Sequence, residues 1–440
     1  MSGISKTSTV SGVVKFLIPK RLEKRIKASN FSKSIGSDSL GASLSMLSMK
    51  RKGVVSAGVT FPKPKHLAKA ILSKIRKAAN FQGSQTNLKD SVYIDMGIFE
   101  GLLNNAITWY SQKYPEYKNG FYDTEKLDTE LDTVFNPLVA EGTDEIDLSF
   151  AQICNIAAIL NPDINKSYSG TDKILEILTF GSNGIPNLNK PILQNGQKLD
   201  MDIIQYISSY AKSKGIKVDL SFGGAVATNA DYALGDPIKA ANDLVALMDK
   251  YNMETVDFDI EDVQGLMANG STKVVTFFKT LHSALAAKDK KVILTVLGST
   301  SQGPKGALKP IFDEFDSCAD GVRLMLYSTS QFYIDADNAD WGIKTWLSII
   351  QDPSKISIGF YDKIPYETPQ SSDPAYSAEK YAGFPPNPTR AEAAVWIYKK
   401  VLSQSGLSID RLGETFLWTD NPLTISQDQF FQEFDKDLNQ

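Results

Sequence analysis

Short β-rich runs alternate with longer helical patterns from residue 91 to residue 440, and no other feature constrains the fold of this chain as strongly. Alternation of this kind is typical of parallel βα units, in which a helix follows each strand. Eight such units in 350 residues predict an α/β protein with a (β/α)8 TIM barrel. The predicted strands begin at Val92, Glu145, Val218, Thr255, Lys291, Gly321, Ile356 and Glu414, and helices are predicted over 200–215, 237–252, 271–290 and 390–406.

A doubly wound open sheet is the alternative architecture for alternating strands and helices. Such sheets bind nucleotides on glycine-rich turns that follow a strand. Neither G-x-G-x-x-G nor G-x-x-x-x-G-K-[ST] follows any of the predicted strands. The barrel is therefore the favoured prediction, with residues 91–440 as one domain.

The charge of the chain is distributed unevenly, and the change near residue 90 predicts a domain boundary there. Residues 1–90 carry 18 Lys/Arg against 3 Asp/Glu, a net +15, whereas residues 91–440 carry 29 Lys/Arg against 48 Asp/Glu, a net −19. Within the basic part, residues 16–31 and 66–79 have the spacing of amphipathic helices. Residues 1–90 are therefore predicted to form a basic, partly helical N-terminal extension.

This basic extension leaves four interpretations open. It is a docking arm on the acidic domain or on another subunit, a nucleic-acid tail, a membrane-surface helix or a targeting peptide. Few aromatic residues are interleaved with the basic ones and no known nucleic-acid motif is present, which disfavours a nucleic-acid partner. We expect docking to a protein partner, or self-assembly, through residues 1–90.

No segment approaches the ~20 consecutive apolar residues of a membrane span, so we expect no transmembrane helix. The apolar stretch 13–19 is shorter than the core of a secretory signal, and basic residues follow it at once, so no signal peptide is predicted. The compartment therefore stays open between the cytoplasm, as the site of synthesis, and delivery by a non-classical route.

Only two histidines and two cysteines occur in the 440 residues, which argues against a His-rich metal site and against a Ser-His-Asp triad. We therefore expect any catalysis to depend on carboxylates, hydroxyls or amides, without a metal or a cofactor.

Three acids alternate with apolar residues in "ETVDFDIED", the fourth predicted strand. One side of a barrel strand packs on helices and the other faces the interior, so Asp257, Asp259 and Glu261 are predicted to point inward. The alternatives are an edge strand with its acids in water and a Mg²⁺ or Ca²⁺ site, although acids spread along one strand suit a single ion poorly. Close carboxylates raise one another's pKa, so the last one stays protonated and donates to a leaving group, as glycoside cleavage requires.

These acids match the D-x-D-x-E signature of glycoside hydrolase family 18, the chitinase family, and three further segments resemble that family in the same order. "SFGG" (Ser221–Gly224) is similar to its S-x-G-G, "MLY" (Met325–Tyr327) is similar to the core of its M-x-Y-D, and "LWTD" places Trp418 at the end of the eighth strand. The resemblance covers residues 91–440. It implies retaining, substrate-assisted hydrolysis of chitin or another β-1,4-linked N-acetylglucosamine polymer or oligosaccharide.

The resemblance also implies a role for each matched residue. Glu261 is expected to be the general acid and base, and Asp259 to orient the acetamido group of the sugar and share a proton with Asp257. Tyr327 is expected to hydrogen-bond the same group, and Trp418 to give the sugar ring a flat platform. The residues expected to bind or support the substrate are Trp418, Ser221, Gly223, Gly224 and Met325.

Two positions depart from the family pattern. Glu254 and Thr255 stand where the family often has Asp-Gly, and Ser328 replaces the aspartate that usually follows the tyrosine of M-x-Y-D. Because that aspartate helps to hold the substrate, the resemblance implies a changed rate, pH optimum or product pattern. The alternatives are a non-catalytic carbohydrate-binding or assembly protein and an endo-β-N-acetylglucosaminidase that acts on N-glycans.

Overall fold

The computed structural model describes residues 10–17, 44–50, 54–61, 89–116, 120–151, 190–225, 227, 232–325, 337–361, 383–385, 388–408, 411–419 and 430–438. The chain divides into two compact units, Met1–Gly83 and Ser84–Gln440. The first strand of the second unit begins at Lys89.

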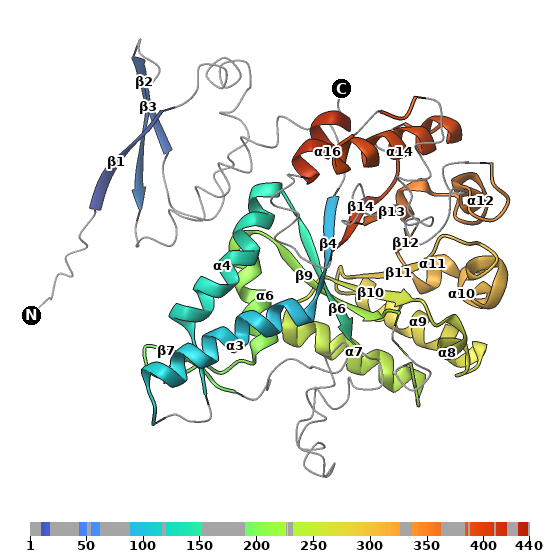
Figure 1. Ribbon diagram of the computed structural model, residues 1–440, viewed down its shortest axis with the longest axis horizontal. Helices are drawn as coiled ribbons and strands as arrows, with labels where there is room; N and C mark the ends of the chain where they lie inside the picture. Colours follow the sequence, from blue (N-terminus) through green and yellow to red (C-terminus); the bar gives the residue numbers. More distant parts are fainter. Residues whose placement is uncertain are drawn as a thin grey trace, which may run out of the picture. The chain divides into compact units, whose positions relative to one another are not determined.

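Eight parallel strands form a closed barrel in the second unit, and helices surround it (Figure 1). The order around the ring is β10-β11-β12-β13-β14-β4-β6-β9, so each strand pairs with its neighbours along the chain. The predicted TIM barrel is confirmed, because all eight predicted strands are present. Their bounds are β4 Lys89–Asp95, β6 Glu145–Ala151, β9 Lys217–Gly223, β10 Thr255–Ile260, β11 Lys291–Leu297, β12 Gly321–Met325, β13 Ile356–Tyr361 and β14 Glu414–Thr419.

The surrounding helices include all four that the sequence predicts. The helical elements are α3 Met96–Lys113, α4 Thr124–Glu141, α6 Ile203–Lys214, α7 Pro237–Tyr251, α8 Val263–Met267, α9 Ser271–Ala286, η6 Gly303–Ala307, α10 Lys309–Phe312, α11 Phe315–Cys318, α12 Ile343–Ile349, η8 Pro353–Lys355, α14 Arg390–Ser405 and α16 Phe430–Leu438. A small separate sheet is formed by β5 Tyr122–Asp123, β7 Ile192–Gln194 and β8 Gln197–Lys198.

Polar caps set the ends of the predicted helices. Asp202 and Gln205 form a reciprocal capping box at the start of α6, and Thr389 and Glu392 form another at the start of α14. At the other end of α6, Gly215 adopts a left-handed φ of 91° that few other residues tolerate. The two capping boxes fix where α6 and α14 begin, and Gly215 fixes where α6 ends. The chain therefore turns sharply at these points.

The strand β10 shows which side chains face the helices and which face the barrel interior. Val256, Phe258 and Ile260 are at most 1% exposed and belong to the main hydrophobic core. The Phe258 ring packs edge-on against Phe277 and Phe278 of α9, at centroid distances of 5.7 and 5.0 Å. Because side chains alternate along a strand, the residues between them point into the barrel.

The described part of the first unit is an antiparallel sheet, in the order β1-β3-β2. Its strands are β1 Val10–Leu17, β2 Leu44–Lys50 and β3 Val54–Phe61. The helical pattern predicted over 16–31 is wrong at its start, because Phe16 and Leu17 end β1 and pair with Val55 and Val54 of β3. Valine and phenylalanine favour a strand where a partner strand is available. Residues 18–31 and the helix predicted over 66–79 lie outside the described residues.

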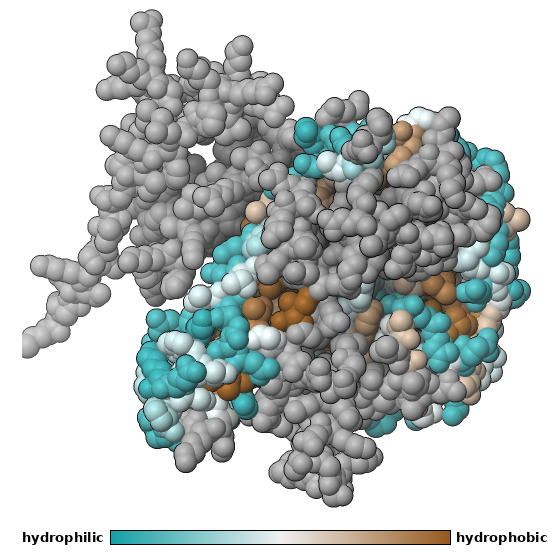
Figure 2. All heavy atoms as spheres, viewed as in Figure 1, coloured by the Kyte–Doolittle hydropathy of each residue, from teal (hydrophilic) through white to brown (hydrophobic). Residues whose placement is uncertain are grey.

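On the face drawn in Figure 2, hydrophilic residues make up most of the coloured surface and hydrophobic ones appear in smaller groups. Among the described residues, the exposed large hydrophobic side chains are Val139, Met201 and Ile238. In the part of the chain that the structure describes, no helix combines the length and the apolar content that crossing a membrane requires.

Candidate active site

Three carboxylates follow one another up the inward face of β10. Asp257 is 0% exposed and Asp259 is 3% exposed, so both lie inside the barrel. Glu261 follows the last strand residue, Ile260, and is half-buried. The three acids therefore rise from the closed interior to the C-terminal mouth of the barrel, which is the end where TIM-barrel enzymes place their active sites.

The Asp257 carboxylate is held by three hydroxyl groups from three other strands. Ser221 Oγ of β9 donates to Oδ2 at 2.5 Å, Tyr93 OH of β4 donates to Oδ2 at 2.9 Å, and Thr295 Oγ1 of β11 donates to Oδ1 at 2.7 Å. Burial raises the pKa of Asp257, while the positive charge of Arg323 and the three hydroxyl bonds oppose that rise. This carboxyl group therefore has a fixed position, and its pKa stays above the usual value because burial is the largest influence.

Asp259 has a different environment two residues further along. Its Oδ1 is buried and has no hydrogen-bond partner among the residues that the structure describes. Burial raises the pKa of Asp259 well above its usual value, and the charges of Glu261 and Asp257 raise it further. Burial also raises the pKa of Glu261. The upper two carboxyls therefore tend to retain a proton, with an oxygen of Asp259 free to bind a ligand.

Two glycines allow β9 and the segment after it to approach the acidic strand. Gly223 and Gly224 have φ values of +112° and +83°, in the region that favours glycine. A Cβ atom on Gly223 would stand 2.1 Å from the carbonyl oxygen of Asp259, and one on Gly224 would stand 2.6 Å from the Phe150 ring. The backbone N–H of Gly224 donates to that same Asp259 carbonyl at 2.9 Å.

Aromatic side chains line the interior beside the acids. Trp418, at the end of β14, is half-buried and stacks on Phe150 with a centroid distance of 5.3 Å and an interplanar angle of 12°. Tyr93 and the buried Met325, at the end of β12, belong to the same cluster. Tyr327, the other matched residue of "MLY", lies outside the described residues, as does Ser328.

Tyr93, Thr295 and Arg323 are among the residues of this interior that were not predicted from the sequence. Arg323 of β12 is 1% exposed, and its Nη1 donates to Asp147 Oδ2 at 2.8 Å and to Tyr93 OH at 3.1 Å. A single arginine inside the apolar strand "GVRLM", at the position between two core residues, is the sequence signal that points to it. Tyr93 and Thr295 carry no such signal, because hydroxyl groups are common in strands.

The described residues contain no group of three or more His, Cys, Asp or Glu side chains with the geometry to hold a metal ion.

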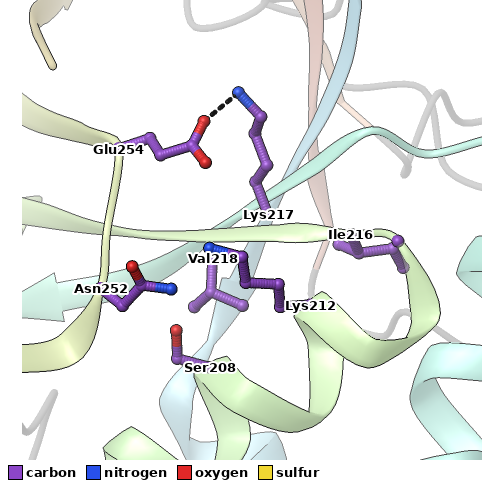
Figure 3. Close-up of a pocket in the computed structure, with 8 residues that line it drawn as sticks. Ser208, Lys212, Ile216, Lys217, Val218, Asn252 and Glu254 are labelled. Atoms are coloured by element: carbon purple, nitrogen blue, oxygen red, sulfur yellow. Dashed lines mark ion pairs between the residues drawn. The ribbon is translucent and has the colours of Figure 1, made fainter. Parts of the chain in front are cut away.

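A pocket of about 200 Å³ lies at the opposite end of the barrel (Figure 3). Lys217 begins β9 and Glu254 directly precedes β10, so the pocket is at the N-terminal ends of these strands. The two side chains form an ion pair. Glu261 follows the other end of β10, so this pocket is separate from the candidate active site. Its lining residues are Ser208, Lys212, Gly215, Ile216, Lys217, Val218, Asn252 and Glu254.

Comparisons with known proteins bear on this site. The family model of the glycosyl hydrolases family 18 matches residues 108–431. No curated protein matches the chain. Among solved structures, a GH18 chitinase from Pseudoalteromonas aurantia is 15% identical, with 68% of this chain and 96% of that chain covered and a TM-score of 0.40.

Two further solved structures are similar at the same level. Active domain 2 of a chitinase from Pyrococcus furiosus is 14% identical, with 81% of this chain and 97% of that chain covered and a TM-score of 0.44. The spore cortex-lytic enzyme SleL from Bacillus megaterium is 11% identical, with 79% and 75% covered and a TM-score of 0.39. The family model alone spans more than half of the 440 residues. The chain therefore belongs to glycosyl hydrolase family 18.

Proposed function

We propose that the protein hydrolyses β-1,4-linked polymers of N-acetylglucosamine, such as chitin, with retention of configuration and with assistance from the substrate itself. Membership of the family supports the broader assignment to the glycoside hydrolases. One observation carries the finer proposal. Asp257, Asp259 and Glu261 form a column that begins at a fully hydrogen-bonded carboxylate inside the barrel and ends at a half-buried one at its mouth.

Glu261 is the general acid and base in this proposal. A general acid must keep its proton near the working pH and must reach the substrate. Burial raises the pKa of Glu261, and its place after the end of β10 brings it to the open end of the barrel. No other acid of the column combines partial exposure with a raised pKa.

The first step breaks the glycosidic bond. The carbonyl oxygen of the substrate's acetamido group forms a bond to the anomeric carbon as the bond to the leaving oxygen breaks, and Glu261 gives its proton to that oxygen. Asp259 accepts a hydrogen bond from the acetamido N–H through Oδ1, the oxygen that has no partner among the described residues. This bond holds the acetamido group in position for attack.

The second step consumes water. The first step leaves an oxazolinium ring, formed by the acetamido group and the anomeric carbon. The Glu261 carboxylate takes a proton from a water molecule whose oxygen forms a bond to the anomeric carbon. The bond from that carbon to the acetamido oxygen breaks, which opens the ring. Two successive inversions at the same carbon give net retention. Asp257 shares a proton with Asp259 during both steps, so the negative charge of the pair stays near −1 as the acetamido group becomes positive.

The remaining matched residues position the sugar. Trp418 is held flat by its stack on Phe150, so its indole face can carry the apolar side of a sugar ring. Ser221 and the two glycines, Gly223 and Gly224, support the acidic strand. Met325 packs in the aromatic cluster beside Trp418. Tyr327 is proposed to hydrogen-bond the acetamido group.

The test is hydrolysis of soluble chitin oligosaccharides by the wild type and by Glu261→Gln. Loss of the general acid is expected to lower kcat/KM by about 10²- to 10⁴-fold. Glu254→Gln is the matched control, because Glu254 lies at the other end of the same strand and pairs with Lys217. The control is expected to keep wild-type activity. No release by the wild type, or equal release by wild type and Glu261→Gln, contradicts the proposal.

The same assay separates the substrate classes. Parallel reactions with an N-glycan that contains a chitobiose core, and with a peptidoglycan chain, show whether chitin is preferred. Release from the N-glycan alone would replace the chitinase-type function with that of an endo-β-N-acetylglucosaminidase. Binding of all three glycans without release would identify a non-catalytic carbohydrate-binding protein.

A further inference from the structure

A single arginine lies in the closed part of the barrel. Among the described residues, Arg323 is the only basic side chain that is buried, with an exposure of 1%. Its strand neighbours, Val322 and Leu324, belong to the core between barrel and helices, so Arg323 points inward. Burial of a charge is costly unless the charge is paired and hydrogen-bonded, so the contacts of this guanidinium group decide what it does.

The guanidinium group reaches across the barrel. β12 and β6 lie four strands apart in either direction around the ring, so Arg323 bonds to the strand opposite its own. Nη1 donates to Asp147 Oδ2 at 2.8 Å, and Nη2 donates to Glu145 Oε1 at 3.1 Å. Nη2 also donates to Glu414 Oε2 of β14 at 3.2 Å. One cation therefore ties together two strands that carry three carboxylates.

The same group also contacts the support of the candidate active site. Nη1 donates to Tyr93 OH at 3.1 Å, and that hydroxyl donates to Asp257 Oδ2 at 2.9 Å. The guanidinium carbon lies 5.4 Å from the centre of the Tyr93 ring, so the arginine contacts both the ring and its hydroxyl. Arg323 fills one acceptor position of the phenol oxygen, and the other polar neighbours of that oxygen are Asp257 Oδ2 and Thr295 Oγ1, which lies 2.7 Å away and itself donates to Asp257.

We propose that Arg323 is a positioning residue of the active site, which orients Tyr93 and stabilises the ionised carboxylate of Asp257 beneath Asp259 and Glu261. The inference rests on the proposed function, because it matters only where that column of acids performs the reaction. In this way a basic residue joins the side chains that support the column of acids. Arg323 itself does not touch the substrate.

The charges around Arg323 give the direction of its effect. The groups that face it are Asp147 and Glu145 of β6, Glu414 of β14, Tyr93 of β4 and Asp257 of β10, and Asp219 of β9 faces the two acids of β6. These neighbours are acidic or neutral, so loss of the guanidinium leaves the interior more negative. The Asp257 carboxyl at the base of the column then ionises less readily, and its pKa rises. Among the influences that lower the pKa of Asp257, the Arg323 charge is the largest.

The pH profile of kcat/KM provides a readout that a merely structural role would not move. On a soluble chitin oligosaccharide, between about pH 4 and pH 9, the acid limb of the Arg323→Met profile, which reports ionisation at the base of the column, is expected about one pH unit above that of the wild type. Arg323→Lys keeps the charge and loses the forked donor geometry. Its limbs are expected to stay at the wild-type positions while kcat falls about tenfold.

A double-mutant cycle tests the route through Tyr93. If Arg323 acts through the phenol, Tyr93→Phe has a smaller effect in an Arg323→Lys background than in the wild type, and the two effects do not add. Ser221→Ala is the matched control, because Ser221 also donates to Asp257 and has no bond to Arg323. The effects of Ser221→Ala and Arg323→Lys are expected to add.

An unchanged acid limb in Arg323→Met, or additive effects of Tyr93→Phe and Arg323→Lys, would overturn the inference while the wild type still hydrolyses the substrate. If Arg323→Met does not fold by circular dichroism, the cycle with Arg323→Lys decides alone. An inactive wild type overturns the proposed function, and this inference with it. A displaced acid limb together with a non-additive cycle supports Arg323 as the positioning residue.

Discussion

Asp257 and Asp259 are the same residue type, two positions apart on one strand, and they occupy opposite environments. Asp257 accepts three hydrogen bonds from hydroxyl groups, and the positive charge of Arg323 acts to lower its pKa. Asp259 has a buried oxygen with no partner among the described residues, and its pKa is raised by burial and by both neighbouring acids. Both oxygens of Asp257 are bonded to the protein, whereas Asp259 Oδ1 has no partner among the described residues.

This difference separates stability from function. A buried charge whose hydrogen bonds come from the protein contributes to a defined fold. A buried polar atom without a partner lowers the free energy of unfolding, and a ligand that bonds to it supplies the missing partner. The residue type therefore does not decide whether an aspartate supports the fold or binds a ligand. The depth of its side chain in the barrel decides it.

Asparagine substitutions at Asp257 and Asp259 are expected to give the largest difference between the two positions. Asp259→Asn is expected to lower kcat/KM on chitin oligosaccharides by about 10²- to 10³-fold, because in the proposed mechanism Asp259 holds the acetamido N–H. Asp257→Asn is expected to cost about tenfold, because it acts through a neighbour. Steady-state kinetics at one pH measures both.

The same pair reverses its order in stability. Asp257→Asn weakens a network of three hydrogen bonds and is expected to lower the free energy of unfolding by about 2–3 kcal/mol. Asp259→Asn removes a buried ionisable carboxyl, whose Oδ1 has no partner among the described residues, and is expected to raise the free energy of unfolding by about 1 kcal/mol. Urea denaturation checks both values, and equal losses in the two variants would show that the layers do not differ.

The barrel itself follows from the sequence to a large extent. The eight strands begin within three residues of their predicted starts, because runs such as "VDFDI" and "KVILTVL" are short, rich in β-branched residues and bounded by turns. The inward orientation of Asp257 and Asp259 follows from the same alternation, once one side of β10 is assigned to the helices.

The partners of these acids do not follow from local pattern. Tyr93 lies 164 residues from Asp257, and Arg323 lies 230 residues from Tyr93, so their contacts depend on the register of strands around a closed ring. The first unit shows the other limit, because apolar and basic residues around Phe16 fit a helix as well as a strand until β3 supplies a partner. The docking role of residues 1–90 stays a prediction.

Glycine at position 223 sharpens the comparison from the backbone side. In Gly223→Ala the new methyl group meets the Asp259 carbonyl oxygen, so β9 and β10 must separate at the upper level. We expect a loss of about 2–4 kcal/mol in the free energy of unfolding, together with lower activity. Gly215→Ala is the control, because Gly215 has a φ of +91° and no atom within 4 Å of the new Cβ. It is expected to lose about 1 kcal/mol and keep its activity.

The smallest effect concerns acids outside the barrel interior. Burial raises the pKa of Glu141, at the end of α4, from 4.5 to about 7, and burial raises that of Asp435 in α16 to about 6. Groups with a raised folded-state pKa favour folding below their unfolded pKa, and this contribution is lost as the pH rises through the folded value. Stability is therefore expected to decline from about pH 4.5 to pH 7.

Glu141→Gln tests this origin. The variant is expected to reduce that decline by on the order of 1 kcal/mol in thermal unfolding across the same range. The pH profile of hydrolysis is expected to stay unchanged, since Glu141 lies outside the barrel interior. A shift of the activity limbs in this variant would connect the outer acids to the reaction and would blur the separation of the two regions.

The most direct measurement of the central claim is the anomeric form of the first product. Proton NMR during hydrolysis of a soluble chitin oligosaccharide resolves the α and β anomers before they equilibrate. A column of acids in which Glu261 serves as both acid and base, with the acetamido group as nucleophile, predicts the β anomer first from the wild type and about a hundredfold less product, or lower, from Glu261→Gln. The α anomer first, or equal release of the β anomer by both proteins, would contradict this account.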